Sequence, residues 1–168
     1  MLAASGVVLS GVEVRRARVG EVAAISAVAL SHGIALDRDD LRSGVAACAA
    51  DDRIGRHLVA MAHGSVVGHA MAVRNAATGF EHTAHLAVSV APDHQRMGVG
   101  SALVGTLKAW AGGVGVRRLV AICDVENAAM RHLLARQGFV CEAPVMLAYR
   151  QDGEGVVHAC AQFACILG

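Results

Sequence analysis

Residues Gln95-Arg96-Met97-Gly98-Val99-Gly100-Ser101 decide how this sequence folds, because they join two segments with different hydrophobic periods. Residues 82–90 (HTAHLAVSV) have the pattern of a strand, and Ala91-Pro92-Asp93 ends it. From residue 98 to residue 111 the apolar side chains recur at helical spacing. A strand, a glycine-containing turn and a helix are therefore predicted in that order.

The turn between this strand and this helix is suited to binding a phosphate group. Glycines let the backbone turn tightly and approach a ligand closely. The first N–H groups of a helix lack intrahelical partners and lie at the positive end of its dipole. Together they predict a phosphate or diphosphate site, to which Arg96 adds a charged contact. A glycine-rich helix start without a ligand is the alternative.

The rest of the chain alternates between strand and helix patterns. Residues 57–63 and 66–74 form a predicted hairpin around Gly64-Ser65, and Asp39 is a plausible N-cap for the second helix. The other predicted strands are 12–18, 118–123, 145–150 and 156–166, and the other predicted helices are 19–31, 37–50 and 127–137. The order β-α-α-β-β-β-α-β-α-β-β predicts one mixed α/β domain over residues 1–168.

Composition excludes several classes of protein. The 168 residues have a formal net charge of +1 and only 17% charged residues, which excludes a nucleic-acid binder acting through bulk charge. No uncharged apolar stretch reaches the ~18 residues of a membrane-spanning helix. The first basic residue is Arg15, so we expect no secretory signal. Five scattered cysteines indicate reduced thiols in a cytoplasm, and the apolar excess favours a homodimer.

Two segments carry a family resemblance. Gln95, Gly98 and Gly100 satisfy the pattern [QR]-x-x-G-x-[GA]. Downstream, residues 127–139 fit N-x-x-[AM]-x-x-L-x(4)-G-F, running from Asn127 to Phe139. With the order of elements, these segments resemble the GNAT superfamily of acyl-CoA N-acyltransferases. The methionine variant of the second segment, followed by an arginine, is similar to bacterial protein-lysine acetyltransferases.

The resemblance implies a site for acetyl-CoA. The backbone amides of residues 96–101 would hold its diphosphate, and residues 86–90 would splay away from residues 119–123 to pair with the pantetheine arm. An N–H near Val88 would polarise the thioester carbonyl. The implied cofactor contacts are Leu86, Val88, Val90, Gln95, Arg96, Met97, Gly98, Val99, Gly100, Ser101 and Asn127. Asn127 fits a helix N-cap equally well.

The resemblance also implies an acetyl transfer to a primary amine by direct attack in a ternary complex. The acceptor would be a small molecule, a protein lysine or a protein N-terminus. Many relatives place a catalytic carboxylate where this sequence has His85, and histidine exchanges protons near neutral pH. Glu81, the nearest acid, is the second candidate base, and a site without either base is a third possibility. Leu134 stands where many relatives have a tyrosine that acts as the general acid. Because the usual carboxylate and this tyrosine are both missing, a non-catalytic acyl-CoA sensor is the alternative function.

Histidines and acids elsewhere give weaker signals. His82 and His85 are three apart on a strand and point to opposite faces, so we expect no metal site. Asp37, Asp39 and Asp40 could attract a cationic amine, but a solvated helix start explains them at least as well.

Overall fold

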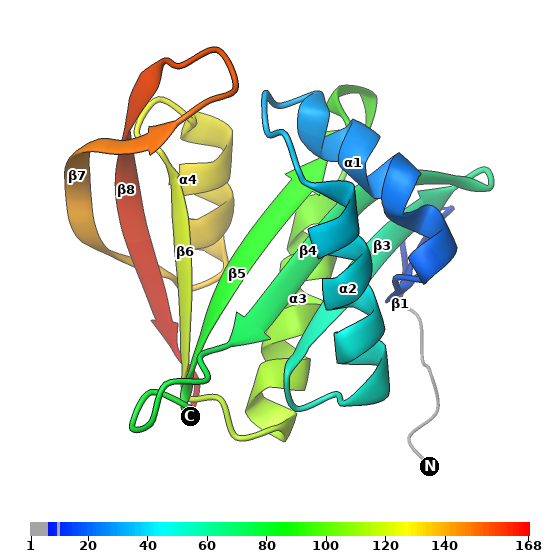
Figure 1. Ribbon diagram of the computed structural model, residues 1–168, viewed down its shortest axis with the longest axis horizontal. Helices are drawn as coiled ribbons and strands as arrows, with labels where there is room; N and C mark the ends of the chain where they lie inside the picture. The colour runs from blue at the N-terminus through cyan, green and yellow to red at the C-terminus, as the bar shows by residue number, and fades with distance from the viewer. Residues whose placement is uncertain (1–6, 10) are drawn as a thin grey trace.

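The computed structural model describes residues 7–9 and 11–168. The described residues form an eight-stranded sheet in the order β1-β2-β3-β4-β5-β6-β8-β7, in which only β5 and β6 are parallel neighbours (Figure 1). The strands are β1 (Val7–Leu9), β2 (Val12–Arg16), β3 (Gly55–Ala62), β4 (Ser65–Arg74), β5 (Thr83–Val90), β6 (Arg118–Asp124), β7 (Val140–Gln151) and β8 (Val157–Ile166). The helices are α1 (Val22–Leu30), α2 (Arg38–Ala50), α3 (Val99–Gly113) and α4 (Ala128–Arg136), with short 3-10 helices at Val19–Glu21 and Pro92–His94.

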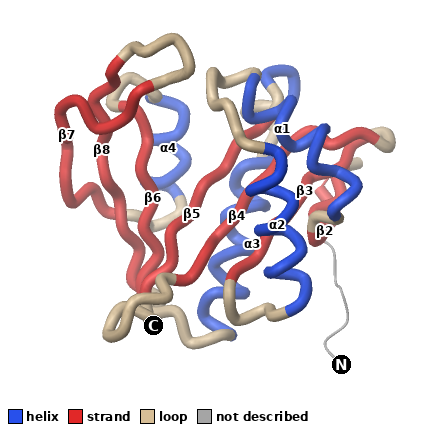
Figure 2. The backbone as a smooth tube through the Cα atoms, viewed as in Figure 1, coloured by secondary structure: helices blue, strands red, loops and turns tan. Residues whose placement is uncertain are grey.

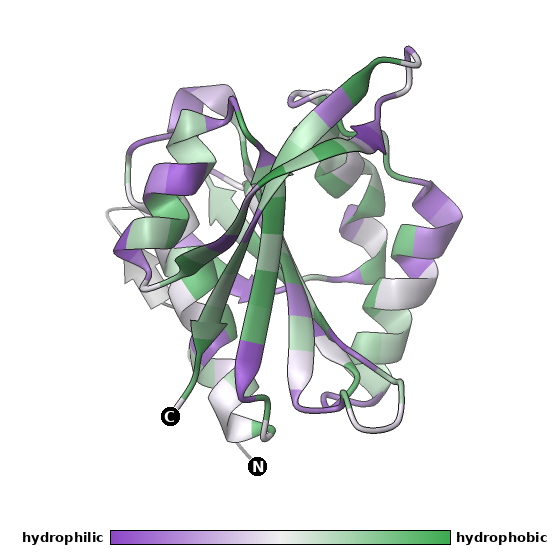
Figure 3. Ribbon diagram, turned by 90° about the vertical axis from the view of Figure 1, so that its left-hand side faces the viewer, coloured by the Kyte–Doolittle hydropathy of each residue, from purple (hydrophilic) through white to green (hydrophobic). Residues whose placement is uncertain are grey.

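Helices cover both faces of the sheet (Figures 1 and 2). α3 and α4 pack on one face over the larger core, to which Leu103, Leu107 and Leu134 contribute. α1 and α2 pack on the other face, where Ile25 and Val45 meet Val59 of β3. The central strands are largely hydrophobic, whereas the helices carry hydrophilic stretches away from the sheet (Figure 3). The mixed α/β architecture predicted from the sequence is confirmed.

The centre of the sheet opens between β5 and β6. Their pairing runs from Thr83 opposite Arg118 to Leu86 opposite Ala121 and stops there. Beyond that point β5 stays paired with β4, and β6 stays paired with β8. The two strands therefore move apart toward their C-terminal ends, as the sequence resemblance implied (Figure 1).

Several predicted elements differ in detail from the observed ones. β1 was not predicted because three residues are too short for a recognisable pattern, and it exists through its pairing with β2. β7 begins at Val140 rather than at residue 145, because register shifts against β8 break the alternation. The segment that we expect to carry no secretory signal falls partly on residues 1–6 and 10, outside the described residues.

Two predicted roles in the first helices are wrong. Asp37, not Asp39, caps α2, and its Oδ1 accepts hydrogen bonds from the N–H groups of Asp39 and Asp40, both at 2.9 Å. The apolar spacing in residues 19–31 predicts that Leu30 shares the inward face of the helix with Val22, Ile25 and Ala29, but Leu30 is 63% exposed and Val28 is buried instead. Leu30 is the last residue of α1 and points away from the buried face that Val22, Ile25 and Ala29 form.

Candidate active site

The start of α3 offers unpaired backbone donors. Gly98 has a φ of +86°, which only glycine adopts without strain, and its carbonyl accepts the N–H of Ala102. The N–H groups of Val99, Gly100 and Ser101 precede the first intrahelical hydrogen bond, and no side chain among the described residues caps them. A Cβ placed on Gly98 would meet nothing within 4 Å. This turn fits a diphosphate.

The other residues of the predicted phosphate turn have different local roles. Gly100 lets two helices approach, since a Cβ there would lie 3.0 Å from Leu133 Cδ2 of α4. Gln95 donates from Nε2 to the carbonyl of Val90 at 3.1 Å and so fixes the turn to the end of β5. Met97 is 62% exposed, and Arg96 is also exposed at a positive φ of 59°. Both side chains are free to meet a ligand.

The edge of β5 that faces the opening carries backbone groups that β6 does not pair. The N–H of Ala91 donates to Val67 of β4 at 2.8 Å, so the preceding carbonyl, that of Val90, points the other way, toward β6. Because peptide groups alternate along a strand, the N–H and C=O groups of Val88 also face the opening. Leu86 is the last residue paired with β6, so an extended ligand could pair with β5 from there onward.

The α1–α2 segment reaches this same strand end. Nε2 of His32 lies 2.8 Å from the carbonyl oxygen of Val90 and donates to it. Gln95 and His32 therefore share one acceptor at the mouth of the opening. Sequence patterns could not reveal this contact, because 58 residues separate its two partners.

Asn127 forms the helix cap that was one of its two predicted roles. Its Oδ1 accepts the backbone N–H of Met130 at 2.9 Å at the start of α4. The cap uses the amide oxygen, which leaves the side-chain NH₂ group as a donor. Asn127 follows the end of β6, so this donor belongs to the open end of the sheet.

The two candidate bases lie in different surroundings. His85 is exposed on β5, level with Val73 of β4 and Val120 of β6. Glu81 lies outside the strand, because β5 begins at Thr83. The Glu81 carboxylate instead accepts the N–H of Gly79 at 2.8 Å, in the loop at the opposite end of β5 from the phosphate turn.

No tyrosine takes the place expected for a general acid. Leu134 is fully buried in the core, and Tyr149 lies on β7 with 52% exposure. Burial also raises the pKa of the Cys123 thiol to about 11, so this cysteine is a packing residue rather than a nucleophile.

A polar cluster at the open end of β6 was not predicted. Asp124 accepts Nε and Nη2 of Arg150 at 3.2 and 2.7 Å, and Cys160 Sγ approaches its Oδ1 at 3.4 Å. His158 Nε2 lies 2.8 Å from Asp152 Oδ2 in the β7–β8 turn. These residues come from three strands and a turn, so only the register of the folded sheet brings them together.

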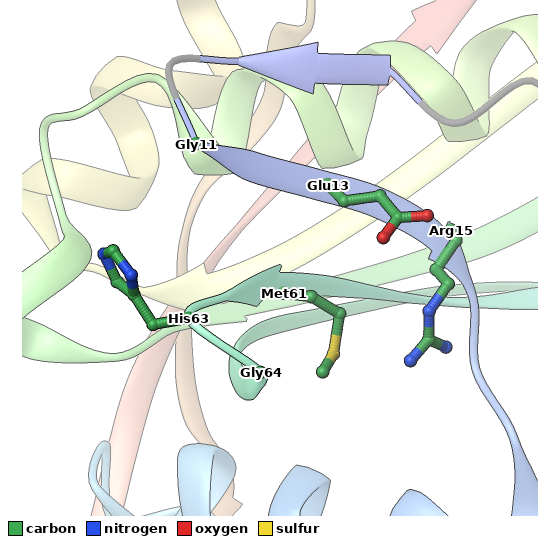
Figure 4. Close-up of a pocket in the computed structure, with 6 residues that line it drawn as sticks. All are labelled: Gly11, Glu13, Arg15, Met61, His63 and Gly64. Carbon is green, nitrogen blue, oxygen red and sulfur yellow. The ribbon is translucent and has the colours of Figure 1, made fainter.

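Among the described residues a further pocket is present, and neither a metal-binding cluster nor a membrane-spanning helix is found. A hollow of about 330 Å³ lies on the sheet edge away from the opening, and its lining residues are Gly11, Glu13, Arg15, Met61, His63 and Gly64 (Figure 4). No group of three or more histidine, cysteine, aspartate or glutamate residues is arranged for a metal within the described part of the chain. Within the same residues, no helix is long and apolar enough to cross a membrane.

A helix start without a side-chain cap, beside a strand edge that β6 leaves unpaired, is the arrangement that the sequence resemblance implied for an acyl-CoA-binding acyltransferase. The acetyltransferase (GNAT) family matches residues 24–139, more than half of the sequence, so the chain belongs to this family. It is an acetyltransferase with acetyl-CoA as co-substrate, as the sequence resemblance implied. A comparison with curated proteins finds no match.

Solved structures share the fold at low sequence identity. The protein yncA of Salmonella typhimurium, solved with its cofactor acetyl-CoA, is 24% identical with a TM-score of 0.81, and 95% of each chain is covered. An N-acetyltransferase of Staphylococcus aureus Mu50 is 20% identical with a TM-score of 0.82, covering 95% of this chain and 100% of that one. A ribosomal-protein-alanine N-acetyltransferase of Brucella melitensis is 25% identical with a TM-score of 0.79, covering 92% and 99%.

Proposed function

We propose that this chain transfers an acetyl group from acetyl-CoA to a primary amine by direct attack in a ternary complex. The observation that carries the proposal is the uncapped start of α3, which lies at the end of the free edge of β5. The helix start would hold the diphosphate through the N–H groups of residues 99–101, with Gln95, Arg96, Met97 and Gly98 forming the rest of the turn. Binding both substrates side by side supplies much of the rate.

The strand edge would hold the pantetheine arm. Acetyl-CoA supplies an acetyl group activated as a thioester. Leu86, Val88 and Val90 are assigned to the backbone pairing, Val90 through its N–H because its carbonyl already accepts Gln95 and His32. The Val88 N–H is assigned to the thioester carbonyl oxygen as a fixed donor. Asn127 is assigned a contact through its free NH₂ group.

His85 is assigned the role of general base, which accepts the proton released as the amine attacks. It is exposed one residue before the last residue of β5 that pairs with β6, whereas the Glu81 carboxylate is bound to Gly79. The thiolate leaves without a side-chain acid, because a thiol with a pKa of about 8.5 is a good leaving group near neutral pH. Leu134 in the usual acid position is consistent with this route.

The proposed acceptor is a small amine, or a lysine or N-terminus of a protein. The similarity to a ribosomal-protein-alanine N-acetyltransferase supports testing peptides alongside small amines. We also assign the chain to the cytoplasm as a single-domain homodimer. The free cysteines support the first assignment, and the exposed apolar residues Val145, Leu147 and Val157 support the second.

Thiol release from acetyl-CoA tests this function. The assay uses spermidine, lysine and an alanine-ended peptide as acceptors, with isothermal titration of acetyl-CoA as a second measurement. We expect His85→Gln to lower kcat/KM about 100-fold and His82→Gln, at an exposed neighbouring position, to leave it unchanged. Tight binding of acetyl-CoA without turnover of any amine would instead identify the alternative, a non-catalytic sensor.

A further inference from the structure

The polar cluster at the open end of β6 lies on the same side of the sheet as His85. His85 is level with Val120, and Asp124 is four residues further along β6, so strand alternation puts these side chains on one face. Arg150 is level with His158 on the neighbouring strands. The cluster stands about 10 Å beyond the last β5–β6 pair, at the entrance of the opening.

The hydrogen bonds of His158 fix which ring nitrogen accepts a proton. Nε2 lies 2.8 Å from Asp152 Oδ2, and because an ionised carboxylate only accepts, Nε2 carries the hydrogen. Nδ1 of the neutral ring therefore carries the lone pair. It lies 3.8 Å from Asp124 Oδ2, and the two side chains are 30% and 32% exposed. A proton bound at Nδ1 would lie close to the Asp124 carboxylate, in addition to the Asp152 carboxylate at Nε2.

The neighbouring charges leave His158 as the proton acceptor of the cluster. The hydrogen bonds from Arg150 hold the pKa of Asp124 below its usual value. The hydrogen bond from His158 does the same for Asp152. Both carboxyl groups are therefore ionised near neutral pH, and Arg150 has no proton to exchange. Cys160, the remaining group, points its thiol at Asp124.

Acetylation of a primary amine removes two protons from nitrogen. A lysine-type amine has a pKa of about 10.4, so it arrives as an ammonium ion with no lone pair. One proton must leave before the attack. The second leaves as the C–N bond forms and the C–S bond breaks, and that proton is the one assigned to His85.

We infer that His158 takes the first proton from a cationic acceptor entering the opening, an inference that rests on the proposed function. The ammonium proton moves to Nδ1, which frees the nitrogen lone pair of the amine. The resulting imidazolium lies between the carboxylates of Asp152 and Asp124 and returns its proton to solvent. Asp152 is a positioning residue, because it sets the tautomer of His158.

The pH dependence of kcat/KM tests this role. The variant is His158→Gln, whose amide still donates to Asp152 but cannot take a proton, and the control is His82→Gln. With spermidine as acceptor we expect His158→Gln to lower kcat/KM at least about tenfold at pH 7. The deficit should shrink toward pH 9.5, where more of the amine is already neutral. Trifluoroethylamine, a weakly basic amine, should be insensitive to the substitution at pH 7.

Three outcomes would overturn the inference in distinguishable ways. An equal loss at every pH and with both amines, or no loss at all, leaves the proposed transferase standing and removes His158 from proton transfer. Wild-type protein that binds acetyl-CoA but releases no thiol with any amine removes both proposals. Isothermal titration shows whether His158→Gln keeps its affinity for acetyl-CoA, as the inference requires.

Discussion

Gly98 has two roles at the start of α3: it adopts a left-handed backbone conformation, and it leaves space for a ligand. Its φ of +86° lies in the left-handed region, where a side chain costs roughly 1–2 kcal/mol. The space above its Cα is open, at the point where the N–H groups of residues 99–101 begin α3. The glycine therefore keeps the helix start both correctly turned and accessible.

Replacing Gly98 by alanine tests this dual role. We expect Gly98→Ala to lower the free energy of unfolding by about 1 kcal/mol and to weaken acetyl-CoA binding about tenfold, because the relaxed turn no longer directs its N–H groups outward. Isothermal titration and urea unfolding measure the two effects.

Gly105 provides the matched control for Gly98. It lies within α3 with open space around its Cα and no positive φ. Gly105→Ala should stabilise the protein by about 0.5–1 kcal/mol and leave the acetyl-CoA affinity unchanged. Wild-type affinity in Gly98→Ala would show that the turn does not bind the diphosphate.

At the scale of elements, α4 depends on the cap that Asn127 provides. Aspartate caps a helix as well as asparagine does, but it lacks the NH₂ group and adds a negative charge. Asn127→Asp should therefore keep the unfolding free energy within about 0.5 kcal/mol of wild type while weakening acetyl-CoA about tenfold. Asn127→Ala should lose about 1 kcal/mol of stability as well. Unchanged affinity in Asn127→Asp would restrict Asn127 to capping.

Elements with local signals were predictable, and elements defined by pairing were not. The hairpin of β3 and β4 was expected, and His63 and Gly64 both take the positive φ of a tight hairpin turn. The start of α3 at Gly98 was also expected. β1 and the first half of β7 depend on partner strands, so the sequence contains no comparable local pattern for them.

The same distinction applies to the candidate site. The phosphate turn was predictable because residues 95–101 are contiguous and glycine has a known backbone preference. The contact of His32 with Val90 joins distant segments, and so does the approach of His158 to Asp124. No spacing rule connects such residues, and their roles follow only from the splay and register of the sheet.

At the scale of the whole molecule, two histidines are buried between the sheet and the layer formed by α1 and α2. His57 on β3 and His69 on β4 are each 6% exposed, and His57 Nδ1 lies 3.1 Å from His69 Nε2. The absence of a side chain on Gly44 lets α2 approach, since a Cβ there would lie 3.4 Å from His57 Nε2. One hydrogen is shared between the facing nitrogens, so this hydrogen bond is lost if both rings are protonated, and burial disfavours the charged form of each ring.

This pair should make the stability of the protein depend on pH. Burial, with a smaller contribution from His57, lowers the pKa of His69 to about 3, whereas an unfolded histidine titrates near 6.5. As the pH falls below about 6.5, the unfolded chain binds a proton that the folded chain excludes, so the folded state loses relative stability. His69 alone should lower the free energy of unfolding by about 2 kcal/mol between pH 7 and pH 5.

Urea unfolding at the two pH values measures this loss of stability. His69→Gln should reduce the loss by about 2 kcal/mol, whereas His63→Gln, in the β3–β4 turn, should leave it unchanged. An identical loss in His69→Gln and wild type would show that the buried pair does not control the acid sensitivity of the fold.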